Sequence, residues 1–177
     1  QKLYTAVIAK INRYSFNKLL DIGCGTGKIL EEILKIRNID AAGIDLSPKM
    51  VGMAKDRLGD KADIRNGDSE RLPWENSFFD AVICTDSFHH YPNPKAVLSE
   101  MKRVLKPEGC IIIADPWLPA PFRQLMNLFM PFGKDGDVKM YSRKDLNMLL
   151  NDSGLKLVNW EKASGSAFIA VVNIPQN

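Results

Sequence analysis

The chain has 177 residues, which is enough for one α/β domain with a sizeable hydrophobic core. Its 45% hydrophobic and 25% charged residues are typical of a globular protein, and no apolar run approaches the roughly 20 residues that a membrane span needs. The net charge of +3 is small and the basic residues are scattered, which argues against a nucleic-acid partner.

The cysteines and the start of the chain indicate a cellular compartment. Cys24, Cys84 and Cys110 show no metal-like spacing and fall in or beside expected strands, so we interpret them as free thiols in a reducing compartment. No signal peptide is visible, and we expect a cytoplasmic location. The chain starts at Gln1 rather than Met, which leaves open that the natural N-terminus lies upstream.

Apolar periodicity predicts helices and strands that alternate along the chain. The first half contains an expected helix over 3–14, a strand over 18–22, a helix over 28–36, a strand over 39–45, a helix that begins at Ser47-Pro48 and a strand over 62–66. The second half contains an expected strand over 79–85, a helix that begins at Asn93-Pro94, a turn over 106–109, a strand over 110–115, a helix over 142–151 and strands over 155–161 and 167–174.

This alternation predicts an α/β fold with a mostly parallel, seven-stranded sheet and helices on both faces. The link between the last two strands is too short for a crossover connection, so they must form an antiparallel C-terminal hairpin. We expect a single domain over residues 1–177, in which residues 116–141 form an insert between the fifth strand and the last helix.

A glycine-rich loop follows the first strand and begins with an acid, in the order Asp21-Ile-Gly23-Cys24-Gly25-Thr-Gly27. Glycine at every second position lets the backbone turn sharply and lets a ligand approach closely, which indicates a cofactor site; the alternative is a tight turn without a ligand. A dinucleotide-binding loop needs its third glycine at position 28, where this chain has lysine. The spacing therefore argues against a nicotinamide-dependent oxidoreductase, and Asp21 is placed to meet an ammonium group.

Acids also follow the second and third strands, whose ends should lie at the same edge of the sheet. Asp45 comes about 20 residues after the glycine loop, the spacing of an acid that binds ribose hydroxyls, and Leu46 and Met50 can lie against an adenine face. In the segment Gly67-Asp68-Ser69, the carboxylate can accept a hydrogen bond from an adenine amino group. The alternatives are an acid that only begins a helix and an Asx-type turn.

The fourth and fifth strands lead into candidate acceptor-side residues. Thr85 ends the fourth strand, and the loop that follows offers His89, His90 or Tyr91 as a substrate contact or proton acceptor, with His89 and His90 as the candidate catalytic residues. We expect the segment from Thr85 to Pro92 to line one wall of the pocket. Alternatively, a histidine fixes its own loop. No third ligand is spaced near the pair, so we expect no metal site. Asp115 either touches substrate or caps its loop.

The insert carries apolar residues at helical spacing from Phe122 to Met130, followed by Phe132. A helix of this kind either belongs to the core or forms a lid over an apolar substrate, and its position after a strand end favours the lid.

The segments LDIGCGTG, NGDSERLPW and FDAVICTDSFHHYPNP resemble motifs of class I S-adenosylmethionine-dependent methyltransferases, of the ubiquinone/menaquinone-biosynthesis type (methyltransferase type 11). The resemblance runs from about Leu19 to Asp115. It implies a Rossmann-like, doubly wound fold, S-adenosylmethionine as cofactor and S-adenosylhomocysteine as product. In that family the acid before the glycines lies near the methionine part of the cofactor, and an Asp after the third strand meets adenine.

The resemblance implies direct methyl transfer to a small-molecule acceptor, which the apolar insert predicts to be partly apolar. The protein must align acceptor and methyl group and exclude water, and needs a base only if the acceptor arrives protonated. The alternative function is a non-catalytic protein that binds S-adenosylmethionine or S-adenosylhomocysteine. The acceptor and the oligomeric state stay open.

Overall fold

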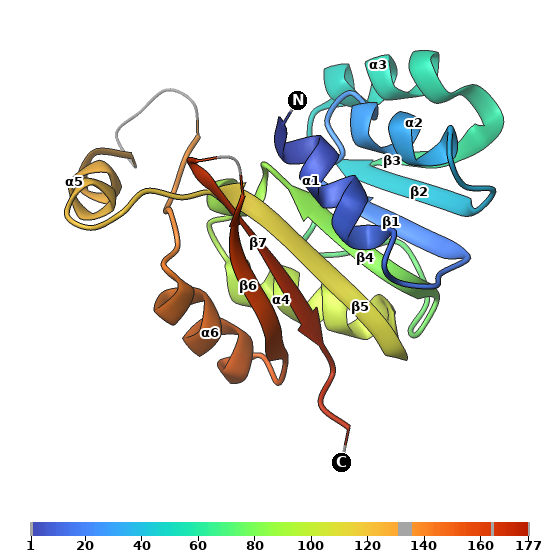
Figure 1. Ribbon diagram of the computed structural model, residues 1–177. Coiled ribbons are helices and arrows are strands. Elements are labelled where there is room, and N and C mark those ends of the chain that lie inside the picture. The colour runs from blue at the N-terminus through green and yellow to red at the C-terminus, as the bar shows by residue number, and fades with distance from the viewer. Residues whose placement is uncertain (1, 131–135, 164, 177) are drawn as a thin grey trace.

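The computed structural model describes residues 2–130, 136–163 and 165–176, which build a seven-stranded sheet in the order β3-β2-β1-β4-β5-β7-β6 (Figure 1). The strands are β1 (Lys18–Ile22), β2 (Asp40–Asp45), β3 (Ala62–Asn66), β4 (Phe79–Thr85), β5 (Leu105–Pro116), β6 (Lys156–Ala163) and β7 (Ala167–Asn173). The first five strands are parallel, whereas β7 is antiparallel to both β5 and β6. The predicted parallel sheet and closing hairpin are confirmed.

Helices cover both faces of the sheet, as expected (Figure 1). One face carries α1 (Lys2–Ile11), α2 (Lys28–Leu34) and α3 (Pro48–Leu58), and the other carries α4 (Pro94–Val104) and α6 (Arg143–Asp152). Short 3-10 helices follow α3 and β4, namely η1 (Gly59–Lys61) and η2 (Phe88–His90). Helix α5 (Phe122–Phe129) stands away from the sheet, within the predicted insert.

Two hydrophobic cores form because successive side chains of a strand point to opposite faces of the sheet. In β5, Ile111 and Ile113 belong to the core under α4 and α6, whereas Ile112 belongs to the core under α1, α2 and α3. A strand that is buried on both faces needs a continuous apolar run rather than an alternating one. This requirement explains the run of isoleucines that marks β5 in the sequence.

The predicted helix starts are confirmed by their capping hydrogen bonds. Ser47 Oγ accepts the Met50 N–H at 3.4 Å at the start of α3, where Pro48 is the first helical residue. Asn93 caps α4 in the same way, and Ser142 forms a capping box with Asp145 at the start of α6. These side chains satisfy backbone groups that the first helical turn leaves without partners.

The expected turn over 106–109 is wrong, because β5 begins at Leu105 and continues through this segment. Leu105 pairs with Phe79 and Cys110 pairs with Ala81, so residues 106–109 form a bulge opposite the single residue Asp80. A Cβ at Gly109 would lie 2.7 Å from the Asp80 carbonyl oxygen, which explains the glycine. The Pro-Glu-Gly composition suits a bulge as well as a turn, and only strand pairing distinguishes them.

The strand order defines where a ligand can bind. Strand β1 lies between β2 and β4, so the chain order reverses direction there, and ligands bind at such a switch point beyond the carboxyl ends of the strands. The glycine loop, Asp45, Gly67 and Thr85 all lie at this edge. Among the described residues, no helix is long and apolar enough to cross a membrane.

Candidate active site at the carboxyl edge of the sheet

The three glycines of the loop all have left-handed backbones, with φ of +70° at Gly23, +53° at Gly25 and +71° at Gly27. Their surroundings differ. A Cβ at Gly23 would lie 2.0 Å from Ser87 Oγ, and one at Gly27 would lie 2.8 Å from a Leu58 methyl carbon. A Cβ at Gly25 would meet nothing within 4 Å. Gly23 and Gly27 are therefore needed for packing, whereas Gly25 borders open space that a ligand can fill.

Asp21 is the least compensated charge of the site. Its side chain is buried, with 1% of the residue exposed, and neither carboxylate oxygen has a hydrogen-bond partner among the described residues. Burial, and secondarily the charge of Asp45, raise the pKa of Asp21 to about 8. An unpaired buried carboxylate is costly unless a cation compensates it. Asp21 therefore fits an ammonium group that arrives with a ligand.

Asp45 connects the glycine loop with the start of α3. One carboxylate oxygen accepts the Gly25 N–H at 2.8 Å, and the other accepts the Ser47 N–H at 2.9 Å. Each oxygen keeps a further lone pair that can accept a hydrogen bond from a hydroxyl group. Leu46 is 73% exposed and Met50 36%, so both leave an apolar surface uncovered beside this carboxylate. Both side chains are available to cover a planar ring, and their contact with adenine stays a prediction.

The residues after β3 are held by the Asx-type turn that the sequence left as the alternative. Asp68 Oδ1 accepts the Glu70 N–H at 2.9 Å, and the Gly67 N–H donates to the Asp45 carbonyl at 3.1 Å. Ser69 is buried and hydrogen-bonds Tyr91. The exposed Asp68 is compatible with both the turn and a ligand contact, whereas Ser69 contacts the interior of the protein.

The loop after β4 is polar and strained. The buried Thr85 hydroxyl has no partner within the part of the chain that the structure describes, and the exposed Asp86 has a φ of +57°. Ser87 Oγ and the Tyr91 hydroxyl are 2.6 Å apart. A left-handed backbone at a non-glycine residue is uncommon and gathers at functional sites. These features support the predicted wall from Thr85 to Pro92.

His89 is fixed by a buried acid. Its Nδ1 lies 2.9 Å from Oδ1 of Asp115, a fully buried carboxylate that also accepts the Ser87 N–H at 3.1 Å. Burial raises the pKa of Asp115, which the hydrogen bond from His89 opposes. Burial disfavours the charged form of His89, but Asp115, Asp137 and Asp86 more than offset this and raise its pKa. Asp115 thus holds the imidazole of His89 in place. The alternative in which a histidine fixes its own loop therefore applies to His89.

His90 and His89 both face Asp137, which comes from the insert. Asp137 Oδ1 lies 3.1 Å from His90 Nδ1 and 3.4 Å from His89 Nε2, and the two rings are 4.0 Å apart between centroids. The expectation of no metal site rested on the lack of a third ligand near the pair. That premise does not hold, because the fold brings Asp137 to both histidines.

Helix α5 presents its apolar side to solvent. No residue of α5 is buried, and Phe122, Leu125, Leu128 and Phe129 are all exposed. The helix is held on its polar side instead, where Asn127 exchanges two hydrogen bonds with the Met140 backbone. The alternative in which this helix forms part of the core is therefore wrong for Phe122–Phe129. Phe132 lies outside the described residues.

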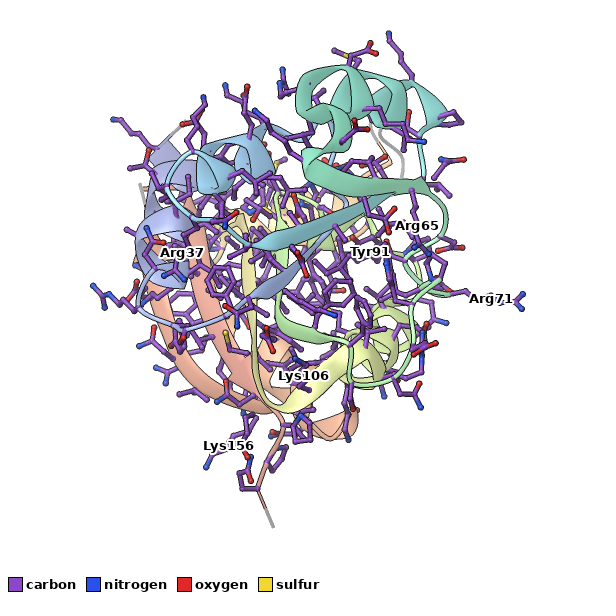
Figure 2. The ribbon with its side chains drawn as sticks, turned by 90° about the vertical axis from the view of Figure 1, so that its right-hand side faces the viewer. Arg37, Arg65, Arg71, Tyr91, Lys106 and Lys156 are labelled. Atoms are coloured by element: carbon purple, nitrogen blue, oxygen red, sulfur yellow. The ribbon has the colours of Figure 1, made fainter. Side chains whose placement is uncertain are left out.

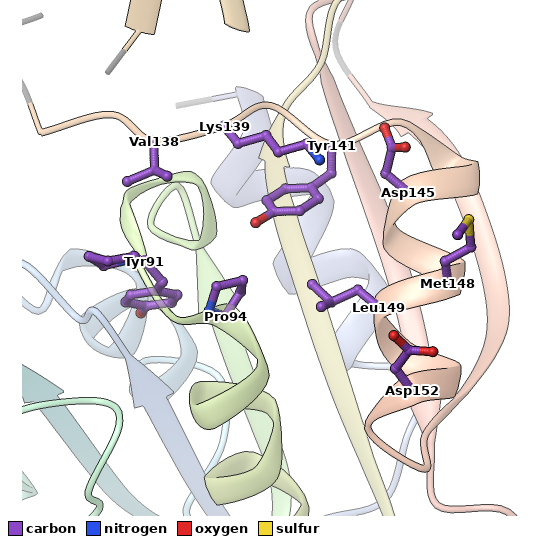
Figure 3. Close-up of a pocket in the computed structure, with 10 residues that line it drawn as sticks. Tyr91, Pro94, Val138, Lys139, Tyr141, Asp145, Met148, Leu149 and Asp152 are labelled. Carbon is purple, nitrogen blue, oxygen red and sulfur yellow. The ribbon is translucent and has the colours of Figure 1, made fainter. Parts of the chain in front are cut away.

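A groove of about 390 Å³ lies between the start of α4 and α6 (Figure 3). Tyr91 and Pro94 form one side, Tyr141 and Leu149 the other, and Val138 lies at one end. The volume is within the range of small-molecule pockets, roughly 300–1,000 Å³. The Tyr91 hydroxyl reaches Ser87 beside the glycine loop, so this ring separates the groove from the loop.

Positive charge is not concentrated on one face. Figure 2 shows Arg37, Arg71 and Lys156 at well-separated places around the molecule. Arg57 binds inward, to the Thr26 carbonyl and hydroxyl beside the glycine loop. This distribution agrees with the small net charge.

Sequence reasoning missed several residues of the site. Asp137 and Ser87 were not singled out. An acid beside glycine within an apolar insert was the available signal for Asp137. No local signal marks Ser87, because its role is to approach Gly23 from another strand.

The family model described as "Methyltransferase domain" matches residues 20–113. The chain is 38% identical over 104 residues to a ubiquinone biosynthesis O-methyltransferase of Dechloromonas aromatica, a match that covers 55% of this chain and 43% of the relative. It is 29% identical over 187 aligned positions to a ubiquinone/menaquinone biosynthesis C-methyltransferase of Burkholderia vietnamiensis, with 89% and 75% covered. Three curated relatives are matched over only 43%, 28% and 57% of their length, so the chain spans about half of them or less.

Solved structures confirm the fold. A methyltransferase from Aquifex aeolicus superposes with a TM-score of 0.78 at 19% identity, over 97% of this chain and 89% of that one. The [4+2]-cyclase SpnF superposes with a TM-score of 0.81 at 19% identity, over 98% and 81%. At this level of identity the likeness shows the fold alone.

Proposed function

The chain belongs to the methyltransferase domain family, and on that premise we propose that it transfers a methyl group from S-adenosylmethionine to a small-molecule acceptor. S-adenosylhomocysteine is then the second product. The observation that carries the proposal is the buried, unpartnered carboxylate of Asp21 beside the open space over Gly25. A ligand with an ammonium group would pair with the Asp21 carboxylate and fill the space over Gly25.

Each part of the cofactor has a matching group in the chain. Asp21 accepts from the ammonium group, and the Asp45 carboxylate accepts from the ribose hydroxyls. Leu46 and Met50 would cover the adenine, and Asp68 would accept a hydrogen bond from its amino group. The open space beside the Gly25 backbone would leave room for the cofactor, since a Cβ there meets nothing within 4 Å.

The bound cofactor supplies a methyl group on a positively charged sulfur, which is already a good leaving group. The protein's own contribution is therefore to position the acceptor and exclude water. His89 and His90 stand beyond the end of β4 and are the groups proposed to contact the acceptor. Asp115 acts as a positioning residue, since it fixes the ring of His89 through Nδ1.

The acceptor that suits this chain is small and partly apolar. The exposed apolar side of α5 supports a lid over such a molecule, and the groove beside Tyr91 offers room for its apolar part. The scattered basic residues support a small molecule over a nucleic acid. The three cysteines, all free and buried, support a cytoplasmic location.

Isotope-labelled S-adenosylmethionine tests the function directly. Purified protein, incubated with labelled cofactor and fractionated metabolite extracts, should form S-adenosylhomocysteine and a labelled product of low molecular mass. The Gly25→Val variant is the control, and product that persists with it comes from a contaminant. Cofactor binding without turnover in any fraction would instead support the non-catalytic alternative.

Binding of S-adenosylhomocysteine should strengthen as the pH rises from 6 to 8. The ligand's ammonium group needs an ionised Asp21, whose pKa in the ligand-free protein is raised to about 8. We expect a roughly 50-fold increase in affinity across this interval, because the ionised fraction of a group with a pKa of about 8 rises from about 1% at pH 6 to about half at pH 8. Isothermal titration calorimetry at several pH values measures it.

The isosteric variant Asp21→Asn is the control for this pH dependence. This variant should bind S-adenosylhomocysteine more weakly, and its affinity should not increase between pH 6 and 8. If its affinity rises with pH as in the wild-type protein, Asp21 does not contact the ligand.

The effect of pH on stability has the opposite sign. Above pH about 4 the unfolded chain has lost the proton that folded Asp21 still holds, so the free energy of unfolding of the ligand-free protein should fall toward pH 8.

A further inference from the structure

Three side chains of types that bind metal ions meet beside the carboxyl end of β4. The potential ligand atoms of His89, His90 and Asp137 all lie within 4.8 Å of one another. Asp137 Oδ1 is 3.4 Å from His89 Nε2 and 3.1 Å from His90 Nδ1. We propose that these three residues bind one divalent transition-metal ion, with Zn²⁺ as the best match.

Asp137 is held at the histidines by its backbone. The Val138 and Lys139 N–H groups both donate to the carbonyl oxygen of His89, at 2.8 and 3.2 Å. Met140 is in turn anchored by the two hydrogen bonds to Asn127. The insert is thus attached to the loop after β4 at the point where Asp137 faces both imidazoles, and the cluster does not depend on a flexible side chain alone.

The tautomer of His89 is set by Asp115. Its Nδ1–H donates to the buried carboxylate at 2.9 Å, which leaves Nε2 to face Asp137. In the neutral imidazole, Nε2 of His89 carries a lone pair. The carboxylate oxygen of Asp137 cannot donate a hydrogen bond to it, whereas a cation placed between the two atoms binds both. A carboxylate bound to the far nitrogen of a metal-ligating histidine is the usual second partner in zinc sites.

The spacing is compatible with one metal ion bound between the three side chains. Two imidazoles and one carboxylate suit Zn²⁺, and ligand atoms about 2.0–2.1 Å from a tetrahedral ion lie roughly 3.4 Å apart. The distances of 3.1 and 3.4 Å agree with that value. Ligand atoms of Asp86, His89 and Asp115 also lie within 4.8 Å of one another, but there Oδ1 of Asp115 already hydrogen-bonds Nδ1 of His89.

The proposed ion keeps positions open for other ligands. The side chains of His90 and Asp137 are 41% and 32% exposed, and three protein ligands with an open position are typical of catalytic zinc sites. An acceptor oxygen can occupy that position, where the ion stabilises its anionic form. This role rests on the proposed function, whereas metal binding itself does not.

Titration of the chelator-treated, tag-free protein with Zn²⁺ tests the site without cofactor or acceptor. Calorimetry should show one ion per chain, and Co²⁺ should give the visible absorption of a low-coordinate ion. Asp137→Asn should weaken Zn²⁺ binding at least tenfold, and Asp115→Asn by about 10–100-fold through the loss of the partner of His89. Asp86→Asn is the matched control, because this neighbouring acid is not a ligand and asparagine accepts its left-handed backbone.

Absent or sub-stoichiometric binding, or equal affinity in wild-type protein and Asp137→Asn, would overturn the proposal. Loss of binding in Asp86→Asn with binding retained in Asp137→Asn would overturn it as well, in favour of the other cluster. The affinity for S-adenosylhomocysteine, measured on the same samples, should not change in Asp137→Asn. A failed metal site is therefore distinguishable from a failed cofactor assignment.

Discussion

Replacing Gly25 by valine should weaken S-adenosylhomocysteine binding by roughly 100-fold or more while the protein still folds. A Cβ at this position meets nothing within 4 Å in the ligand-free protein, so the side chain creates no internal clash. The valine side chain instead occupies the space beside the loop backbone that the cofactor is proposed to fill. The left-handed φ of +53° adds a folding cost of roughly 1–2 kcal/mol. Calorimetry measures the affinity, and thermal unfolding measures the folding cost.

Gly59→Val separates backbone strain from loss of the ligand's space. Gly59 has a φ of +54°, also borders open space, and ends α3 directly after Leu58, which packs against Gly27 rather than Gly25. The control should lose stability and retain the affinity of the wild-type protein. If Gly25→Val also retains that affinity, the loop is only a structural turn and the cofactor assignment fails.

Asp45→Ala should raise the dissociation constant for S-adenosylhomocysteine by roughly 10–150-fold. The carboxylate is proposed to accept hydrogen bonds from the ribose, and a hydrogen bond to a charged group contributes about 1.5–3 kcal/mol. The substitution also frees the Gly25 N–H, which Asp45 binds at 2.8 Å, so the loop loses part of its support. Both effects weaken binding, and calorimetry measures their sum.

Asp80→Ala is the matched control for this change. Asp80 likewise accepts two backbone N–H groups, from Asn17 at 2.9 Å and Lys18 at 2.8 Å, but it lies at the start of β4, the opposite edge of the sheet. It should lower the free energy of unfolding without changing the affinity. Equal affinity losses in both variants would show that Asp45 acts through stability alone.

The sequence by itself determined the architecture and which candidate residues follow the strands at the carboxyl edge of the sheet, because both depend on residues that are near one another in the chain. Apolar periodicity marks each strand and helix, and the caps at Ser47, Asn93 and Ser142 involve neighbours three positions away. The glycine loop and Asp45 have a fixed spacing because the helix and strand between them have a fixed length. A parallel sheet then brings the strand ends together at one edge.

Only the tertiary structure decided which side chains meet across loops. The three glycines look alike in sequence, yet Ser87 leaves no room for a side chain at Gly23 and α3 leaves none at Gly27, whereas no neighbouring atom limits the space at Gly25. Helix α5 is attached to the rest of the protein through its polar residue Asn127 and leaves its apolar residues exposed. Periodicity cannot predict this, because it shows that a helix has an apolar face but not which part of the protein packs against that face.

Asp137 shows the same limit at the acceptor side. It reaches His89 and His90 because the Val138 and Lys139 N–H groups bind the His89 carbonyl oxygen, a contact between backbone atoms far apart in the chain. Such hydrogen bonds involve no side-chain type and leave no pattern in the sequence. The acids and histidines were therefore visible as candidates, but their assembly into one cluster depended on how the insert folds back onto β4.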